Sequence, residues 1–221
     1  MTRRNAADRF YSRWAPLYDQ LAHHTPGIAG LRRRTVRRMA LAPGMRILDM
    51  GCGPGPNFAP IRTAIGNRGE LVGIDVAGGA LTRAQARIQR SEWENVHVVR
   101  ADATTPPIPA SDAVIAAFVI GMFEHPDRVV DVWCDHVGSG GTIGLLHFAQ
   151  SDRPYAVLPN ALLRCLVFLS TPGRGDMHGN ATDVLHRRVR AGYSSLEQRC
   201  SAYSYTTHWG GLVHIATGTV D

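Results

Sequence analysis

A short apolar run that ends in an acid and then breaks into closely spaced glycines is the feature that most constrains this fold. The segment 46–55 reads R-I-L-D-M-G-C-G-P-G, with the acid at Asp49 and glycines at positions 51, 53 and 55. Glycine allows positive φ and lets a ligand approach the backbone closely. We therefore predict a buried strand followed by a tight loop that contacts a cofactor.

A second acid stands at the end of the next apolar run. Residues 71–74 read L-V-G-I and lead directly into Asp75. In sheets of this kind, an acid at the carboxyl end of the second strand is placed to accept hydrogen bonds from ribose hydroxyls. The two runs together predict one pocket for a nucleoside.

The runs I-L-D-M-G-C-G-P-G and G-E-L-V-G-I-D resemble the class I S-adenosylmethionine-dependent methyltransferases. They are most similar to the small-molecule branch that includes the ubiquinone and menaquinone C-methyltransferases. The resemblance implies S-adenosyl-L-methionine as the cofactor, with the ribose bound by the second acid. It implies the following cofactor-binding residues around these two loops: Asp49, Gly51, Cys52, Gly53, Gly55, Asp75 and Val76.

The amino-acid composition excludes several classes of catalytic and binding site. The chain has 221 residues and is 44% hydrophobic, which favours one globular domain. All 24 residues counted as lysine or arginine are arginine, so a Schiff-base lysine and a lysine-containing phosphate loop are excluded. The four cysteines form no C-x-x-C pair, so no metal site is predicted. The first residues contain no apolar targeting region and no run is long enough to span a bilayer, so we expect a cytoplasmic protein.

From residue 46 to 148, apolar runs alternate with helical segments, the pattern of β-α units and a parallel sheet. We predict an α/β, Rossmann-like fold with a seven-stranded, mostly parallel sheet flanked by helices. The single methyltransferase domain would comprise a helical lid (1–42), a cofactor-binding core (43–148), a substrate-covering insert (149–181) and a C-terminal helix with a strand hairpin (182–221).

The patterns also predict the bounds of individual elements. Helices are expected over 60–65, 80–90, 126–136 and 183–191, the last ending at Gly192. Further strands are expected over 96–100, 111–120, 142–148, 195–205 and 211–217.

Two more segments carry cofactor predictions. Asp102 and Ala103 follow the third strand, where the resemblance implies contacts to the adenine ring, although Asp102 could instead cap the turn before Thr104. Phe118, in the expected fourth strand, is also assigned to the cofactor site. That strand lacks the N-P-P-Y type sequence of nucleobase and amide methyltransferases, which counts against those substrates.

The N-terminal 42 residues read as helical and amphipathic. Tyr18 lies in a segment similar to one that covers the active site in quinone methyltransferases, and it is assigned to the cofactor site; core packing is the alternative. Five arginines lie between residues 32 and 38 in a chain of net charge +6. Such a run is usually a solvated helix face, and the alternative is an RNA or membrane patch.

Methyl transfer from a sulfonium needs alignment and exclusion of water, and a general base only when the acceptor must lose a proton. His147, near the end of the fifth strand, is the first candidate for that base, and a packed histidine is the alternative. Weaker candidates are His125, Asp152, Tyr155 and His178.

The sequence thus predicts methyl transfer to a small, largely apolar acceptor, such as a quinone precursor, a lipid or a secondary metabolite. An RNA methyltransferase and a non-catalytic S-adenosylmethionine-binding module are the alternatives, and a NAD-linked dehydrogenase is disfavoured because the glycines recur as G-x-G-x-G. The expected partner is a small-molecule substrate rather than nucleic acid. Peripheral membrane contact and the oligomeric state stay open.

Overall fold

The strands form a single sheet in which all but one run in the same direction. The computed structural model describes residues 27–151, 153, 156, 160–161 and 181–221. Within this part of the chain, the strand order is β3-β2-β1-β4-β5-β7-β6. The strands are β1 (Arg46–Met50), β2 (Glu70–Asp75), β3 (Val96–Arg100), β4 (Ala113–Ala117), β5 (Thr142–Phe148), β6 (Ser204–His208) and β7 (Val213–Thr219). Only β7 runs antiparallel to its neighbours, β5 and β6, which confirms the predicted seven-stranded, mostly parallel sheet.

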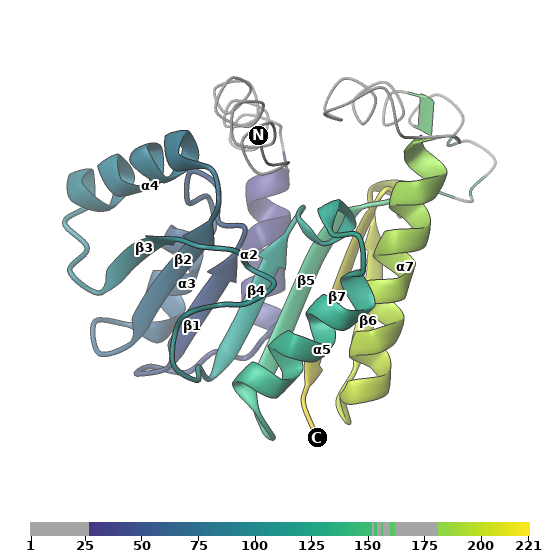
Figure 1. The fold of residues 1–221 in the computed structure, drawn as a ribbon. Helices are drawn as coiled ribbons and strands as arrows, with labels where there is room; N and C mark the ends of the chain where they lie inside the picture. The colour runs from purple at the N-terminus through teal and green to yellow at the C-terminus, as the bar shows by residue number, and fades with distance from the viewer. Residues whose placement is uncertain (1–26, 152, 154–155, 157–159, 162–180) are drawn as a thin grey trace, which may run out of the picture.

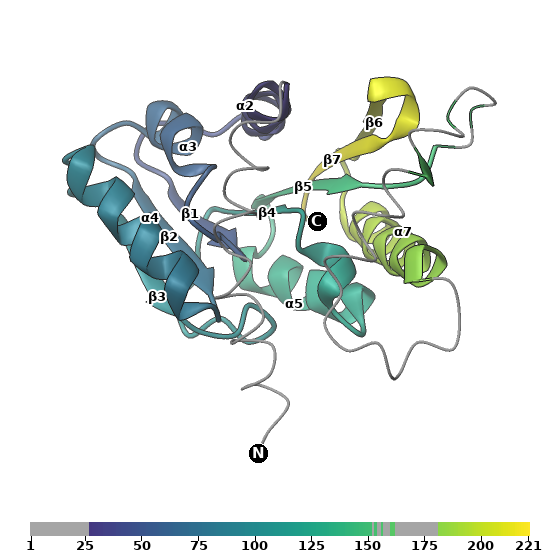
Figure 2. The ribbon, with the colours of Figure 1, turned by 90° about the horizontal axis from the view of Figure 1, so that it is seen from above.

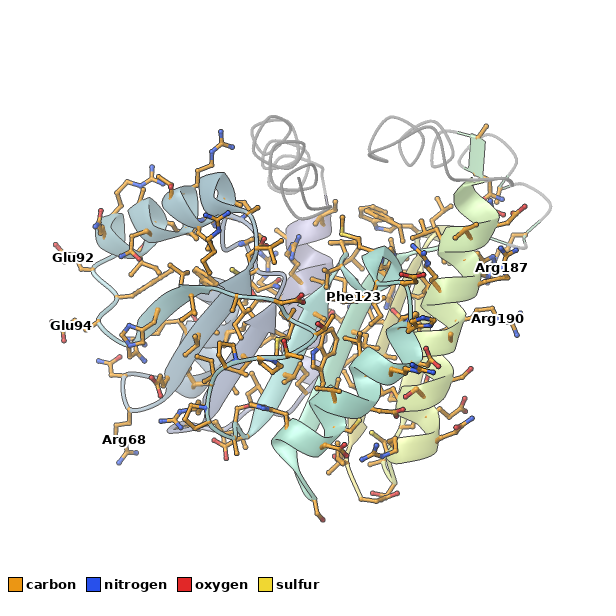
Figure 3. The ribbon with its side chains drawn as sticks, viewed as in Figure 1. Arg68, Glu92, Glu94, Phe123, Arg187 and Arg190 are labelled. Atoms are coloured by element: carbon orange, nitrogen blue, oxygen red, sulfur yellow. The ribbon has the colours of Figure 1, made fainter. Side chains whose placement is uncertain are left out.

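Helices cover both faces of the sheet (Figure 1, Figure 2). On one face lie α2 (Ile28–Arg38), α3 (Phe58–Ile65) and α4 (Gly78–Arg90), and on the other lie α5 (Pro126–Val137) and α7 (Ala181–Arg199). Each face has its own buried apolar cluster, because strands covered on both sides need apolar residues at successive positions. The continuous apolar runs of the sequence therefore became the central strands.

Several predicted elements have the bounds that the sequence indicated. The strands at 96–100 and 142–148 are confirmed without change, and α3 and α4 each begin two residues earlier than expected. The fourth strand is shorter than the predicted 111–120. It ends at Ala117 because Phe118 has a φ of 64°, which breaks the extended backbone, and the short helix η1 (Ile120–Met122) follows.

The prediction that the last helix ends at Gly192 is wrong. Helix α7 continues to Arg199, so the expected strand from residue 195 begins only at Ser204. Gly192 lies inside the helix because the backbone there approaches η1 and α5 closely: a Cβ would lie 2.9 Å from Ile120 Cγ1 and 3.5 Å from Pro126 Cβ. The glycine serves helix packing, not helix termination.

The strand order indicates which edge of the sheet is suited to bind a ligand. From β1 the chain proceeds outward to β2 and β3, and then returns to the other side of β1 with β4. Parallel sheets bind ligands beyond the carboxyl ends of the strands at such a reversal. These ends form the upper edge of the sheet in Figure 1. The predicted lid (1–42) and insert (149–181) lie mostly outside the described residues.

The contrast between two helical glycines gives a test of this packing. Gly192→Val should lower the free energy of unfolding by about 1–3 kcal/mol, because the new side chain would collide with buried Ile120. Gly30→Ala in α2 is the control: its Cβ would come no closer than 4.0 Å to Arg33 Nη2, so a gain of about 0.5–1 kcal/mol is expected. Chemical denaturation of both variants measures the two changes. A Gly192→Val protein as stable as the wild type would contradict the packing role.

Candidate functional site

The glycine loop after β1 forms the centre of the candidate site. Gly51, Gly53 and Gly55 have φ values of 66°, 55° and 78°, a backbone conformation that residues with a Cβ rarely adopt. The amides of Gly51 and Cys52 both donate to the carbonyl of Ile74, at 2.8 and 3.0 Å, which ties the loop to the end of β2. A Cβ on Gly53 would meet no atom of the described residues within 4 Å, so with respect to them this residue presents bare backbone.

Asp75, the last residue of β2, holds the same loop through its side chain. Its carboxylate accepts hydrogen bonds from the Gly53 amide at 2.8 Å and from the Ala77 amide at 2.9 Å. Burial raises the pKa of Asp75, while these backbone donors oppose the rise. The next residue, Val76, leaves 40% of its surface exposed, which is unusual for a large apolar residue beside a buried strand. The predicted pair therefore lies at the carboxyl edge of the sheet, beside the glycine loop.

Asp49 is completely buried beneath the loop. Its Oδ1 accepts a hydrogen bond of 2.9 Å from the Asn57 side chain. Its Oδ2 has no hydrogen-bond partner among the described residues. Burial raises the pKa of this carboxyl group to about 7, against the lowering effects of the Asn57 hydrogen bond and of the nearby Arg32 charge. A buried carboxylate with a free acceptor position marks this site for a donor or a cation.

Cys52 is a packed thiol inside the loop. Its side chain is 2% exposed and lies against Gly73, where a Cβ would come within 2.8 Å of the sulfur. Burial raises its pKa well above that of an ordinary thiol, and the carboxylates of Asp49 and Asp75 add to the rise. The neutral thiol is therefore no nucleophile.

Asp102 and Ala103 lie where the chain leaves β3. The Asp102 Oδ1 accepts hydrogen bonds from the backbone amide and the hydroxyl of Thr104, at 3.0 and 2.8 Å. The turn-capping alternative is therefore a feature of the structure, and it leaves the adenine contact as a proposal. Ala103 is buried, and its carbonyl accepts a bond of 2.7 Å from the Trp133 indole.

An aromatic row begins directly after β4 and continues to the end of β5 and to the turn between β6 and β7. The Phe118 ring stacks on Phe148 with centroids 4.7 Å apart, and Phe148 lies 6.3 Å from Trp209. Phe118 and Trp209 have φ values of 64° and 51°, which are strained for residues of this size, and Trp209 is 40% exposed. Strain of this kind is often found at ligand sites.

His147 points to the α7 side of the sheet and is 5% exposed. Its Nδ1 lies 2.7 Å from the Phe148 carbonyl, which only accepts, so Nδ1 carries the proton and Nε2 accepts the Gly121 amide at 3.4 Å. Burial lowers its pKa to about 4. Both nitrogens are engaged and the ring is a weak base, so this geometry gives the general-base prediction no support.

The structure thus gathers Asp49, Asp75 and the glycine loop at one place, with Phe118 at the neighbouring strand end. Tyr18 lies outside the described residues. Sequence reasoning missed Asn57 and Arg32, which are both buried and hydrogen-bonded to each other. A signal existed for Arg32: it stands four residues from both Ile28 and Val36, on the apolar stripe of its helix.

These residues fit the cofactor that the sequence implied. The bare backbone at Gly53 leaves room for close approach, and the free Oδ2 of Asp49 suits a cationic amino-acid group. Asp75 has the carboxylate oxygens that ribose hydroxyls would need as acceptors, and the exposed Val76 would offer apolar surface to an adenine ring.

Comparison with known sequences agrees with this fit. Residues 47–141 match a family described as the methyltransferase domain. The chain is 31% identical over 167 residues to a phosphatidylethanolamine N-methyltransferase of Cereibacter sphaeroides, covering 72% of this chain and 77% of the relative. It is 29% identical over 184 residues to the aklanonic acid methyltransferase DauC of Streptomyces sp. (strain C5), covering 76% and 84%. A demethylmenaquinone methyltransferase of Lysinibacillus sphaericus is 26% identical over 127 residues, covering 57% of this chain and 53% of the relative.

The fold agrees as well. A SAM-dependent methyltransferase from Aquifex aeolicus superposes with a TM-score of 0.63, at 16% sequence identity, over 89% of this chain and 94% of that protein. At this identity the match concerns the fold, whereas the first of the sequence relatives is similar enough to establish the family. The chain therefore belongs to the class I S-adenosylmethionine-dependent methyltransferases.

Proposed function

We propose that this enzyme transfers the methyl group of S-adenosylmethionine to a small, largely apolar acceptor, such as a quinone precursor, a lipid or a secondary metabolite. The observation that carries the proposal is the aromatic row of Phe118, Phe148 and Trp209, which starts directly after β4, the strand paired with β1. Aromatic side chains of this kind line sites for apolar and planar ligands. The relatives are named for phosphatidylethanolamine, aklanonic acid and demethylmenaquinone, which supports an acceptor of these classes.

S-adenosylmethionine supplies an electrophilic methyl group on a sulfonium. The residues of this chain would bind the cofactor, orient the acceptor and exclude water. In this proposal Asp75 and Val76 bind the adenosine, Asp49 and the loop bind the methionine part, and Asp102 with Ala103 borders the adenine. His147 acts as a positioning residue for η1 through the Gly121 amide.

The division of the chain into a core, a lid and an insert is part of the proposal. Residues 43–148 would form the cofactor-binding core, while the lid (1–42) and the insert (149–181) would cover the acceptor. Among the described residues, no helix has the length and apolar character needed to cross a membrane.

The arginines of α2 keep RNA as a second candidate acceptor. Arg33, Arg34, Arg37 and Arg38 are exposed on one helix. Binding through them would be electrostatic, so retention on RNA would fall steeply with salt. If the protein is not retained on RNA even at low salt, this alternative is refuted.

The proposed function is tested by transfer of labelled methyl groups to a panel of acceptors: a quinol, phosphatidylethanolamine vesicles, an aromatic polyketide acid and RNA. Trp209→Ala should raise KM for the apolar acceptor roughly three- to tenfold, the size of one lost aromatic contact, without changing cofactor affinity. Val132→Ala, which truncates an exposed apolar residue of α5, is the control. Methylation of RNA alone would overturn the proposal.

Asp75→Ala should weaken S-adenosylmethionine binding at least tenfold. Hydrogen bonds to a charged group are worth roughly 1.5–3 kcal/mol each, and this variant also frees the Gly53 amide. Titration calorimetry gives the affinity. Asp112→Ala is a matched control, since it also removes a carboxylate that holds a backbone amide, that of Arg46, but at the opposite end of the sheet. Equal affinity in the two variants would refute the assignment of Asp75.

His147→Ala should lower kcat by up to about tenfold, the effect of one lost hydrogen bond, and leave cofactor affinity intact. His147→Gln should recover most of the rate, because the amide oxygen can accept the Gly121 amide in place of Nε2. Steady-state kinetics and calorimetry measure both quantities. A glutamine variant as slow as the alanine variant would restore the general-base role.

A further inference from the structure

Helix α2 contains one arginine in a different environment from its neighbours. Arg32 is 3% exposed, whereas Arg33, Arg34, Arg37 and Arg38 are exposed. Arginine is almost never fully buried unless it is paired, because the charge loses its hydration. The solvated-face interpretation therefore holds for four members of the run and fails for Arg32, whose burial requires compensating contacts.

Those contacts lead from α2 to the cofactor loop. Arg32 Nη1 donates to Asn57 Oδ1 at 2.7 Å, and the Asn57 amide nitrogen donates to Asp49 Oδ1 at 2.9 Å. The Arg32 guanidinium also lies 5.0 Å from the centre of the Phe118 ring, within cation–π range. All three hydrogen-bonded side chains are buried, at 3%, 2% and 0% exposure.

The order of donors and acceptors in this chain has a consequence for Asp49. Arginine can only donate, so its bond fixes the Asn57 side chain with the oxygen toward α2 and the amide nitrogen toward Asp49. That nitrogen then bonds one carboxylate oxygen, Oδ1, and leaves Oδ2 without a partner among the described residues. Arg32 on α2 thus determines the orientation of the Asp49 side chain through Asn57.

In the described part of the chain, the charges that face Asp49 come from two elements. Arg32 on α2 is a cation and favours the ionised carboxylate, whereas Asp75 at the end of β2 opposes it. The Cys52 thiol of the loop is neutral, and the residue opposite Asp49 on β4 is the apolar Ile115. Removal of Arg32 would therefore leave Asp49 buried beside a like charge.

We propose that Arg32 is a positioning residue for the cofactor: through Asn57 it orients Asp49, and its charge favours the ionised carboxylate, so that Oδ2 accepts the cationic methionine part of S-adenosylmethionine. The inference rests on the proposed function for the identity of the ligand. The geometry of the Arg32–Asn57–Asp49 chain itself does not depend on it. Its consequence is a cofactor affinity that depends on pH near neutrality, because a protonated Asp49 cannot attract the cation.

Arg32→Met tests the proposal by calorimetry with S-adenosylmethionine between pH 6 and pH 9. The midpoint of the pH dependence should rise by about one pH unit, the usual effect of losing one nearby opposite charge, so that binding is about tenfold weaker below the midpoint and nearly restored at pH 9. Arg33→Met, which removes an exposed charge from the same helix, should behave as the wild type. A loss of the same size at every pH, or no loss, would overturn the proposal.

A second measurement separates this inference from the proposed function. Carbon-13 NMR of the cofactor-free protein follows the Asp49 carboxyl resonance, assigned by its absence in Asp49→Asn. Its titration midpoint should be higher in Arg32→Met and close to the wild-type value in Arg32→Lys, which keeps a cation in place and guards against a misfolded methionine variant. An unchanged midpoint in Arg32→Met refutes the role of Arg32, whereas absence of S-adenosylmethionine binding in the wild type refutes the proposed function.

Discussion

A carboxylate buried at the point where the sheet reverses its strand order is the constraint on which the site depends. Asp49 is the penultimate residue of β1, before the glycine loop, and is fully removed from solvent. A charge in that position is costly unless other groups compensate it. Asn57, at the N-terminal cap of α3, and Arg32, on α2, compensate the charge of Asp49. The glycine loop is held to Asp75 at the end of β2. Helix packing and loop conformation thus serve the same carboxylate.

The burial of Asp49 costs stability at neutral pH. The folded-state pKa of Asp49, about 7, lies above the ordinary value of 3.8, so folding favours the protonated form. The energetic penalty is absent below pH of about 4, where the group is protonated in both states, grows as pH rises, and is complete above about pH 7. A cationic ligand at Oδ2 would remove part of that penalty. If Asp49 binds a cation as proposed, the site is least stable when the carboxylate is ionised and able to bind.

The glycines show how far local sequence patterns can be interpreted. At Gly53 the pattern predicted a loop glycine, and the positive φ there is the local property that glycine supplies. At Gly192 the same residue type predicted a helix end, but the helix continues, because the glycine is required by the approach of Ile120 and Pro126. Those neighbours are distant in sequence. Asp102 belongs between the two cases, since its turn cap is local, whereas the proposed adenine contact would depend on the packed fold.

The sequence by itself determined the parallel sheet, the glycine loop and the acids at two strand ends, because hydrophobic periodicity and backbone freedom are properties of consecutive residues. Only the tertiary structure decided that one arginine of five is buried, that both nitrogens of His147 are engaged, and that Phe118, Phe148 and Trp209 form a row. Burial and hydrogen-bond partners arise from segments far apart in the chain. They therefore exist only once the helices and strands have packed together.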